Sequence, residues 1–362
     1  MSVVWLTLPR VDETQVLTAE AELTRGDDPP EPPAGLTRGD DAADPPAGLA
    51  ESAGASAPSD TGATDSPGQG PGRLSWSLSP SRAADFLTCP LLYRFRVIDR
   101  LPEAPSPAAA RGTLVHAVLE RLFDAPATAR NPQAAAELIA PAWDQLIAAE
   151  PDLADLFGDE TERETWFTQA KEMLDRYFTL EDPTRLEPAH RELQVEAVLE
   201  SGLRLRGYID RVDISPAGDV RIVDYKTGTA PREEFEARAL FQMKFYALVL
   251  WRTRGTVPRM LQLIYLGNGE LVRYAPDEAD LLATERKVEA LWRAIERARD
   301  AADWRPRRGR LCDWCAHQAL CPEFGGTPPP LPTPEELASR YARPRPAPAE
   351  AAPHMADIAD LT

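Results

Sequence analysis

Asp210, Asp224 and Lys226 lie close together in the sequence and have side chains suited to phosphate chemistry. All three fall within residues 203–228 (LRLRGYIDRVDISPAGDVRIVDYKTG), and Lys226 shares a strand face with Asp224. Two carboxylates on an apolar face are costly unless a cation neutralises them. Mg²⁺ and Mn²⁺ prefer such oxygen ligands, and a lysine could help to deprotonate an attacking water or steady the charge on a phosphate. The alternative is an Asp–Lys–Asp ion-pair cluster without catalytic activity.

The spacing of these residues predicts a hairpin that brings both carboxylates together. Residues 216–219 (PAGD) are typical of a turn. If the hairpin is centred there, apolar residues pair with apolar residues, and Asp213 pairs with Arg221 across the strands. The same register places Asp210 opposite Asp224, whereas a slip of one residue would turn both carboxylates away from the apolar face.

The four cysteines of the chain predict a bound metal. Cys312, Cys315 and Cys321 form a compact cluster, and Cys89 lies far upstream. In a cytoplasmic protein this spacing favours metal over disulfides. Four thiolates could hold structural Zn²⁺ or an iron–sulfur cluster, and the spacing leaves that choice open. The alternative is a set of inert buried cysteines. Ligands from both ends would join the two ends of the globular region, so metal loss should destabilise it as a whole.

Arginine residues just before the cysteine cluster could contact nucleic acid. Guanidinium and aromatic side chains together suit phosphate contact and base stacking. The alternative is a solvated arginine-rich linker, and the acidic total charge does not exclude a local basic patch. The residues concerned are Arg305, Arg307, Arg308 and Arg310, with Trp304 and Trp314 beside them.

Hydrophobic periodicity predicts the elements that position these residues. A short helix capped by Ser81 should end at Cys89-Pro90. Longer helices are expected over about 108–123, 133–149, 161–179, 233–253 and 277–301. Strands are expected over about 191–199, 203–214 and 219–227, followed by a hairpin over 259–274 with Asn268-Gly269 as its turn. This order predicts an α+β or mixed α/β fold with a helical N-terminal subdomain.

Composition divides the chain into three parts. Residues 1–75 are rich in Pro, Gly and Ala and contain a tandem copy, LTRGDDPPEPPAG at 23–35 and LTRGDDAADPPAG at 36–48. They hold 13 acidic and 4 basic residues, and this acidic excess accounts for half of the chain's net charge of -18. We expect disorder there, because apolar surface is scarce, and again over the Pro- and Ala-rich residues 325–362. Residues 76–324 are expected to form the globular domain.

Three classes of protein are disfavoured by the sequence. No lysine follows a glycine, so a phosphate-binding loop and an ATP-driven motor are excluded. No apolar run approaches the roughly 20 residues that span a bilayer. The first residues (MSVVWLTLPR) lack the basic and long apolar regions of a secretory signal. We therefore expect a cytoplasmic protein without membrane contact.

Taken together, the motifs resemble the restriction-endonuclease-like PD-(D/E)XK core of RecB-type exonucleases. Residues 207–213 (GYIDRVD) and 223–227 (VDYKT) resemble its two catalytic strands, with Ile-Asp in place of Pro-Asp. Gln242-x3-Tyr246 resembles the downstream Q-x3-Y motif, and Gly112-x3-His116 the upstream G-x3-H motif. The cysteines resemble the iron–sulfur clasp of the subgroup that includes the AddB nuclease domain and CRISPR-associated adaptation nucleases. The resemblance covers about 76–324.

The resemblance implies a role for each matched residue. His116, Asp210, Asp224 and the Tyr225 carbonyl would bind Mg²⁺ or Mn²⁺, and Lys226 would be the catalytic lysine. Gln242 and Tyr246, one helical turn apart, would orient the site and touch DNA. Cys89, Cys312, Cys315 and Cys321 would hold a [4Fe-4S] cluster that shapes the DNA-binding region.

Three further acidic residues could approach this site. Glu192 and Glu196 lie on the preceding strand, and Glu120 follows His116 by one helical turn and could orient its ring. Asp213 is better explained as the partner of Arg221.

We therefore expect a metal-dependent deoxyribonuclease that hydrolyses single strands or duplex ends in repair or recombination. Because the chain lacks an ATP motor, unwinding would fall to a separate helicase. One alternative is a non-catalytic DNA-binding repair scaffold, which would bind DNA without cleaving it. The other is a zinc-stabilised interaction protein, which would be colourless where a [4Fe-4S] protein is brown.

Overall fold

The computed structural model describes residues 77–230, 233–333 and 335–337. The proposed N-terminal tail lies outside the described residues, as does the C-terminal tail from residue 338. At the centre is a six-stranded mixed sheet. Five of its strands follow the order β1-β3-β4-β5-β6, and the sixth, β2, lies off this path and pairs with β3. The strands are β1 (Ser77–Leu78), β2 (His190–Val198), β3 (Arg204–Ile214), β4 (Val220–Lys226), β5 (Met260–Tyr265) and β6 (Glu270–Tyr274).

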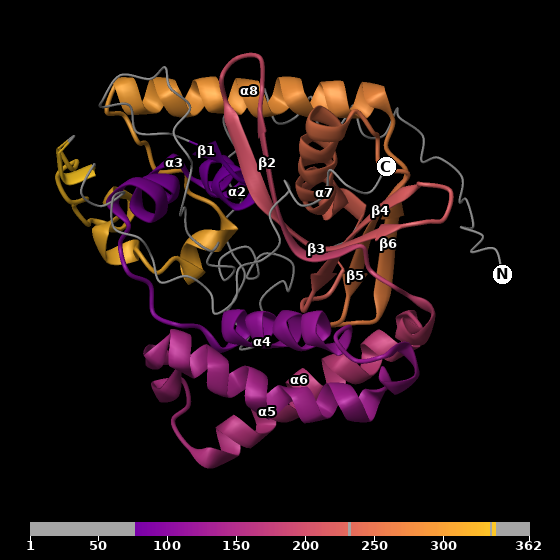
Figure 1. Cartoon of the computed structure of the whole chain (residues 1–362). Coiled ribbons are helices and arrows are strands. Elements are labelled where there is room, and N and C mark those ends of the chain that lie inside the picture. Colours follow the sequence, from indigo (N-terminus) through magenta and orange to yellow (C-terminus); the bar gives the residue numbers. More distant parts are fainter. Residues whose placement is uncertain (1–76, 231–232, 334, 338–362) are drawn as a thin grey trace, which may run out of the picture.

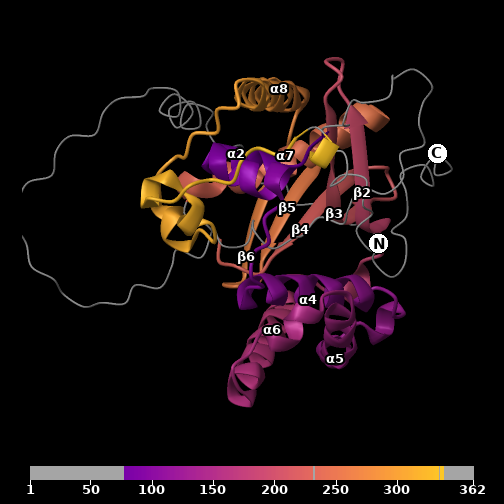
Figure 2. The same cartoon turned by 90° about the vertical axis from the view of Figure 1, so that its left-hand side faces the viewer.

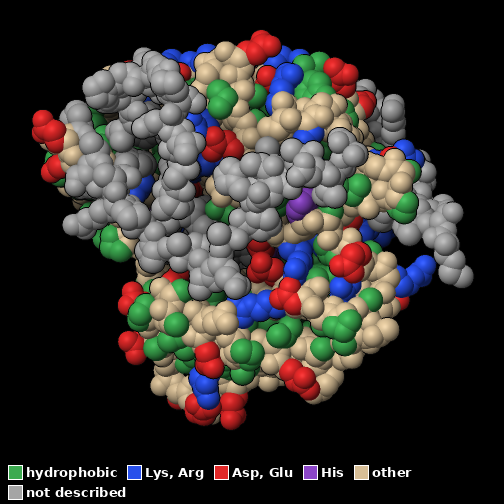
Figure 3. Space-filling model, in the orientation of Figure 1, with side chains coloured by type: hydrophobic (Ala, Val, Ile, Leu, Met, Phe, Trp, Pro, Cys, Tyr) green, Lys and Arg blue, Asp and Glu red, His purple; other side chains and the backbone are tan. Residues whose placement is uncertain are grey.

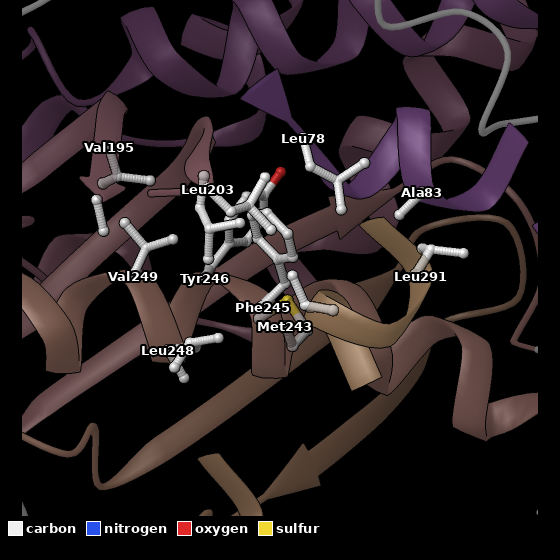
Figure 4. Packing of buried hydrophobic residues seen from close by; sticks show 14 of the residues in the cluster. Leu78, Ala83, Val195, Leu203, Met243, Phe245, Tyr246, Leu248, Val249 and Leu291 are labelled. Atoms are coloured by element: carbon white, nitrogen blue, oxygen red, sulfur yellow. The ribbon is translucent and has the colours of Figure 1, made fainter. Parts of the chain in front are cut away.

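Helices cover both faces of this sheet (Figures 1 and 2). On one face, α4 (Pro107–Leu122), α5 (Pro132–Ala149) and α6 (Glu160–Leu180) share an apolar core with residues of β4 and β5. On the other face, α7 (Glu233–Arg254), α8 (Glu278–Asp300) and α2 (Pro80–Thr88) share a second core with β2 and β3. Figure 4 shows Phe245 and Tyr246 of α7 among the buried leucines of that second core. The predicted helical subdomain is thus one layer of a three-layer α/β fold.

Short helical segments complete the described chain. α3 (Pro90–Tyr93) and a π-helical stretch (Arg94–Asp99) follow α2. Three single 3₁₀ turns connect the longer elements, at Ala127–Ala129, Pro151–Asp155 and Pro183–Arg185. Three more form the cysteine-containing segment, at Arg310–Trp314, Gln318–Leu320 and Pro322–Phe324. This segment lies beside α3 at the left edge of Figure 1.

The mixed α/β prediction and the main elements are confirmed, with ends shifted by one or two residues. The hairpin register is confirmed from Arg211 to Ile214, where Asp213 pairs with Arg221, but the β3–β4 ladder ends before the predicted Asp210–Asp224 pair. The predicted cap at Ser81 is wrong: the Ser79 side chain accepts from the Arg82 amide, and Pro80 occupies the first helical turn. Proline at that position fits a helix start and explains the shift. None of the helices in the described residues is long and apolar enough to cross a membrane.

Candidate active site

His116 of α4 meets the strands β3 and β4 where Asp210 and Tyr225 lie. Its Nε2 is 2.9 Å from the Tyr225 carbonyl oxygen, and its Nδ1 is 3.5 Å from Asp210 Oδ2. The Tyr225 amide donates to the same Asp210 oxygen at 2.7 Å. Three of the four predicted metal ligands are therefore in contact, and they come from three different elements.

Asp224 and Lys226 form a second polar group with residues of α7. Lys226 Nζ is 2.7 Å from Asp224 Oδ2 and 3.0 Å from Gln242 Oε1. The Gln242 amide donates to Asp224 Oδ1 at 2.9 Å and lies 3.2 Å from the Tyr246 hydroxyl. Gln242 therefore touches both catalytic candidates. Tyr246 is only 6% exposed, so its position suits orienting Gln242 rather than touching DNA directly.

Glu192 of β2 also belongs to the site. One ligand atom each of His116, Glu192 and Asp210 lie within 4.8 Å of one another, a spacing that can hold a metal ion. Asp224, which was also predicted as a ligand, is not in this group and is held by Lys226 and Gln242 instead. An imidazole with two carboxylates is a donor set that fits Mg²⁺ or Mn²⁺.

A break in strand alternation places Glu192 there. Leu193 and Ile209 belong to the core beside α7, whereas Arg191 reaches the α4 carbonyl of Glu120 and Arg211 lies over the Phe123 ring. In regular strands, residues two apart share a face, so both strands change face between these positions. The β2–β3 ladder omits the Glu192–Asp210 pair, and Glu192 has φ = 44°. A positive φ at a non-glycine residue is uncommon, so ordinary periodicity does not predict this placement.

Burial and crowding of carboxylates set the electrostatics of the site. The pKa of Asp210 is raised to about 6, because burial and the nearby Asp224 outweigh the lowering effects of His116, Lys226 and the Tyr225 amide. Burial likewise raises the pKa of Glu192 well above its usual value, with Asp210 and Glu120 adding to the effect. Carboxylates that are costly to ionise in each other's presence are stabilised by a bound cation. Figure 3 shows acidic and basic side chains side by side along the boundary between the lower helical layer and the rest of the molecule.

The other acidic candidates lie outside the metal group. Glu196 pairs with Arg204 at 2.5 Å, away from the site. Glu120 is close enough to raise the pKa of Glu192, but no contact joins it to the His116 ring. Asp213 pairs with Arg221, as predicted.

The chain brings the upstream cysteine to the C-terminal cysteine segment. The Arg307 amide donates to Cys89 Sγ at 3.3 Å, and the Gly309 amide donates to Cys312 Sγ at 3.3 Å. Burial raises the pKa of the Cys315 thiol, and its neighbours Cys89 and Cys312 raise it further. Cys321 is half-buried and free like the other three. Thiols that lie close together and accept backbone N–H groups fit a metal–thiolate site.

The arginine-rich stretch is partly committed to contacts within the protein. Arg307 donates to the Leu87 carbonyl, and Arg305 pairs with Asp303 at 2.9 Å. Trp304 is buried and stacked on Tyr93, so the prediction that it could stack on a base is wrong. Trp314, in contrast, is 56% exposed.

The chain is similar to several known proteins. The model of the PD-(D/E)XK nuclease superfamily matches residues 77–322. The Gene 69 protein of Mycobacterium phage D29 is 26% identical over 206 residues, which cover 49% of this chain and 70% of that protein. A crystal structure of a "putative exonuclease" from Eubacterium rectale has a TM-score of 0.46 and 18% identity, and the alignment covers 67% of this chain and 87% of that one.

Proposed function

From the premise that this chain belongs to the PD-(D/E)XK nuclease superfamily, we propose that it is a metal-dependent deoxyribonuclease of the RecB exonuclease type. It hydrolyses phosphodiester bonds in single-stranded DNA or at duplex ends. The observation that carries the proposal is the meeting of His116, Asp210 and the Tyr225 carbonyl next to the Asp224–Lys226 pair.

His116, Asp210 and the Tyr225 carbonyl would hold Mg²⁺ or Mn²⁺, with Glu192 beside them and Asp224 at the adjoining position. The bound ion would supply Lewis-acid stabilisation of the phosphate. This requires the Tyr225 carbonyl to exchange its contact with His116 Nε2 for the ion. The donor set supports the assignment, because it combines hard oxygen atoms with one imidazole.

Lys226 is the proposed catalytic lysine. Its ammonium group is held by Asp224 and Gln242 and is partly exposed, so it can reach a substrate at the edge of the site. In that position it would offset the charge that builds on the phosphate and would position the attacking water. Gln242 fixes the lysine and the carboxylate together, and Tyr246 fixes Gln242.

The test is cleavage of end-labelled single-stranded DNA with Mn²⁺ or Mg²⁺, using protein purified without oxygen. Asp224→Ala should lose at least about 100-fold in rate, because Lys226 loses its partner and the site loses a carboxylate. Asp219→Ala is the matched control: it removes a partly exposed carboxylate from the turn of the same hairpin, and it should cleave normally. Wild type that is folded and binds DNA without cleaving it would identify the scaffold alternative instead.

The proposed second cofactor is a [4Fe-4S] cluster held by the four cysteines. The support for it is that Cys89 lies at the C-terminal cysteine segment and that backbone amides donate to Cys89 and Cys312. Four thiolates could also hold a single zinc ion, which is the alternative. Anaerobically purified protein should be brown and contain iron and sulfide; a colourless protein with one zinc would support the zinc alternative.

The proposed setting is DNA repair or recombination in a reducing compartment such as the cytoplasm. Four free cysteines support that compartment. The missing phosphate-binding loop supports a separate helicase as the source of unwound DNA. Stimulation of cleavage by a helicase on blunt duplexes, but not on single strands, would test this partner.

A further inference from the structure

A buried polar network lies on the α4–α6 side of the sheet and reaches the proposed metal site through Tyr225. Its centre is Arg211, which is 1% exposed. Arg211 Nη2 is 2.8 Å from Glu181 at the end of α6, and its Nε is 3.1 Å from Asp213. Arg211 Nη1 donates to the Tyr225 hydroxyl at 2.5 Å. The remaining members are Arg221 and Gln262, which bond to Asp213 and Glu181 respectively.

This network is joined to the metal site through Tyr225. The main chain of Tyr225 provides the carbonyl that contacts His116 and the amide that donates to Asp210. Its ring packs edge-on against the His116 ring, with 6.0 Å between the centroids. Arg211 also follows Asp210 directly in the chain, and Tyr225 lies between Asp224 and Lys226. Each end of the Arg211–Tyr225 bond is therefore adjacent to a proposed ligand or catalytic residue.

We propose that Arg211 is a positioning residue, which sets the metal affinity of the site by holding Tyr225 through its hydroxyl. The inference rests on the proposed function, since it concerns the same metal site. A buried arginine with three directed contacts fixes its partners more rigidly than packing alone, because its planar fork has a preferred geometry. Some residues hold a metal ligand in place without binding the metal themselves. Their substitution typically lowers metal affinity or activity by about 10- to 100-fold.

Tyr225→Phe tests the inference most cleanly, because it deletes one hydroxyl and keeps the buried ring and the main chain. Mn²⁺ binding to the full-length protein is measured by calorimetry and by the electron paramagnetic resonance signal of free Mn²⁺. The dissociation constant should rise about 10- to 100-fold. Cleavage should fall at low Mn²⁺ and recover in part at saturating Mn²⁺. The matched control is Tyr93→Phe, the same change at a buried tyrosine of the other core, which should bind Mn²⁺ like wild type.

Variants of Arg211 provide a second test of the inference. Arg211→Met leaves Glu181 and Asp213 without this partner and could prevent folding, whereas Arg211→Lys keeps the charge and should retain part of the affinity. Tyr225→Phe that is less heat-stable but binds Mn²⁺ like wild type would overturn the inference, because Arg211 would then be purely structural. Wild type that binds no Mn²⁺ and cleaves no DNA would reject the proposed function itself, and this inference with it.

Discussion

The ring of Tyr246 lies directly against Gly207: a Cβ atom at position 207 would come within 2.6 Å of a carbon of that ring. Gly207 opens the GYID run on β3, and Tyr246 closes the Q-x3-Y run on α7. The two motifs are therefore parts of one contact, in which a glycine lets the helix approach the sheet. That approach brings Gln242 to Asp224 and Lys226.

Gly207→Ala should displace Tyr246 and with it Gln242. Forcing a methyl group into a packed interior costs about 1–3 kcal/mol, so the midpoint of thermal unfolding should fall and cleavage should fall with it. Gly158→Ala is the control, because its Cβ would meet only the flexible Glu162 side chain at 3.4 Å. Normal stability and cleavage in Gly207→Ala would show that the Tyr246 contact does not control the site.

Gln242→Ala should slow the chemical step more than it weakens DNA binding. The amide joins Asp224 to Lys226 and Tyr246, so its loss frees the lysine ammonium from one of its partners. Single-turnover cleavage should drop about 10- to 100-fold, with a smaller change in DNA affinity. Lys244→Gln on the same helix is the control, since Lys244 pairs with Asp280 away from the site. An equal loss in both variants would indicate a general effect on α7.

Some parts of this site are predictable from sequence because they depend on pairing along the chain. The β3–β4 register follows from matching apolar and charged partners, and a slip would expose the core face. The helix positions of His116 and Gln242 follow from regular periodicity. All of these features involve residues that follow the regular side-chain alternation of a strand or the regular period of a helix.

Other parts depend on tertiary geometry that local periodicity does not encode. Glu192 reaches the metal group because the strand changes face at a positive φ. Its position next to arginines predicts that Trp304 lies at the surface, yet packing against Tyr93 and Phe86 buries it. The Arg211 network is also hard to predict, because its strand residues Arg211, Asp213 and Arg221 are charged and alternate with apolar residues, as on a solvent-facing strand. Only the covering helices α4–α6 show that this face is buried.

Asp210→Asn should stabilise the metal-free protein at neutral pH. The folded-state pKa of Asp210 is raised to about 6, mainly by burial, above its unfolded value of about 3.9. A raised pKa means that the folded state favours the protonated carboxyl, so this contribution to stability is complete below pH about 4 and is lost as the pH rises through about 6. The amide cannot ionise, so the unfolding midpoint in EDTA should exceed that of wild type at pH 7.5 and approach it near pH 4.

Added Mn²⁺ should reverse this order at pH 7.5, because only wild type keeps the ligand. Asp213→Asn is the contrasting variant: its carboxylate is paired with Arg211 and Arg221, so its loss should destabilise the protein at pH 7.5. Asp210→Asn that is less stable than wild type in EDTA at pH 7.5 would contradict the expected cost of ionising Asp210.

Cys89→Ser should release the cysteine segment but leave the core intact, which replaces the expectation from sequence that metal loss would destabilise the whole globular region. Trp304 precedes the segment and is packed in the core against Tyr93, so its position does not depend on a bound metal cluster. Beyond it, the contacts to residues 89–103 include the Arg307 amide to Cys89 and the His317–Glu103 pair at 2.7 Å. A metal cluster bound by all four thiols would hold the remainder of the cysteine segment in place. Losing one ligand should therefore remove the cluster and its brown colour.

Limited proteolysis separates that outcome from general unfolding. In Cys89→Ser, new cleavage sites should appear within residues 305–326, while the chain before Trp304 stays resistant because its core is intact. Glu103→Gln is the comparison: it weakens the His317 contact but leaves the thiols, so the protein should stay brown and be cut more slowly than Cys89→Ser. Cys89→Ser that keeps its colour and its resistance would show that Cys89 is not a ligand, and that the three downstream cysteines bind the metal without it.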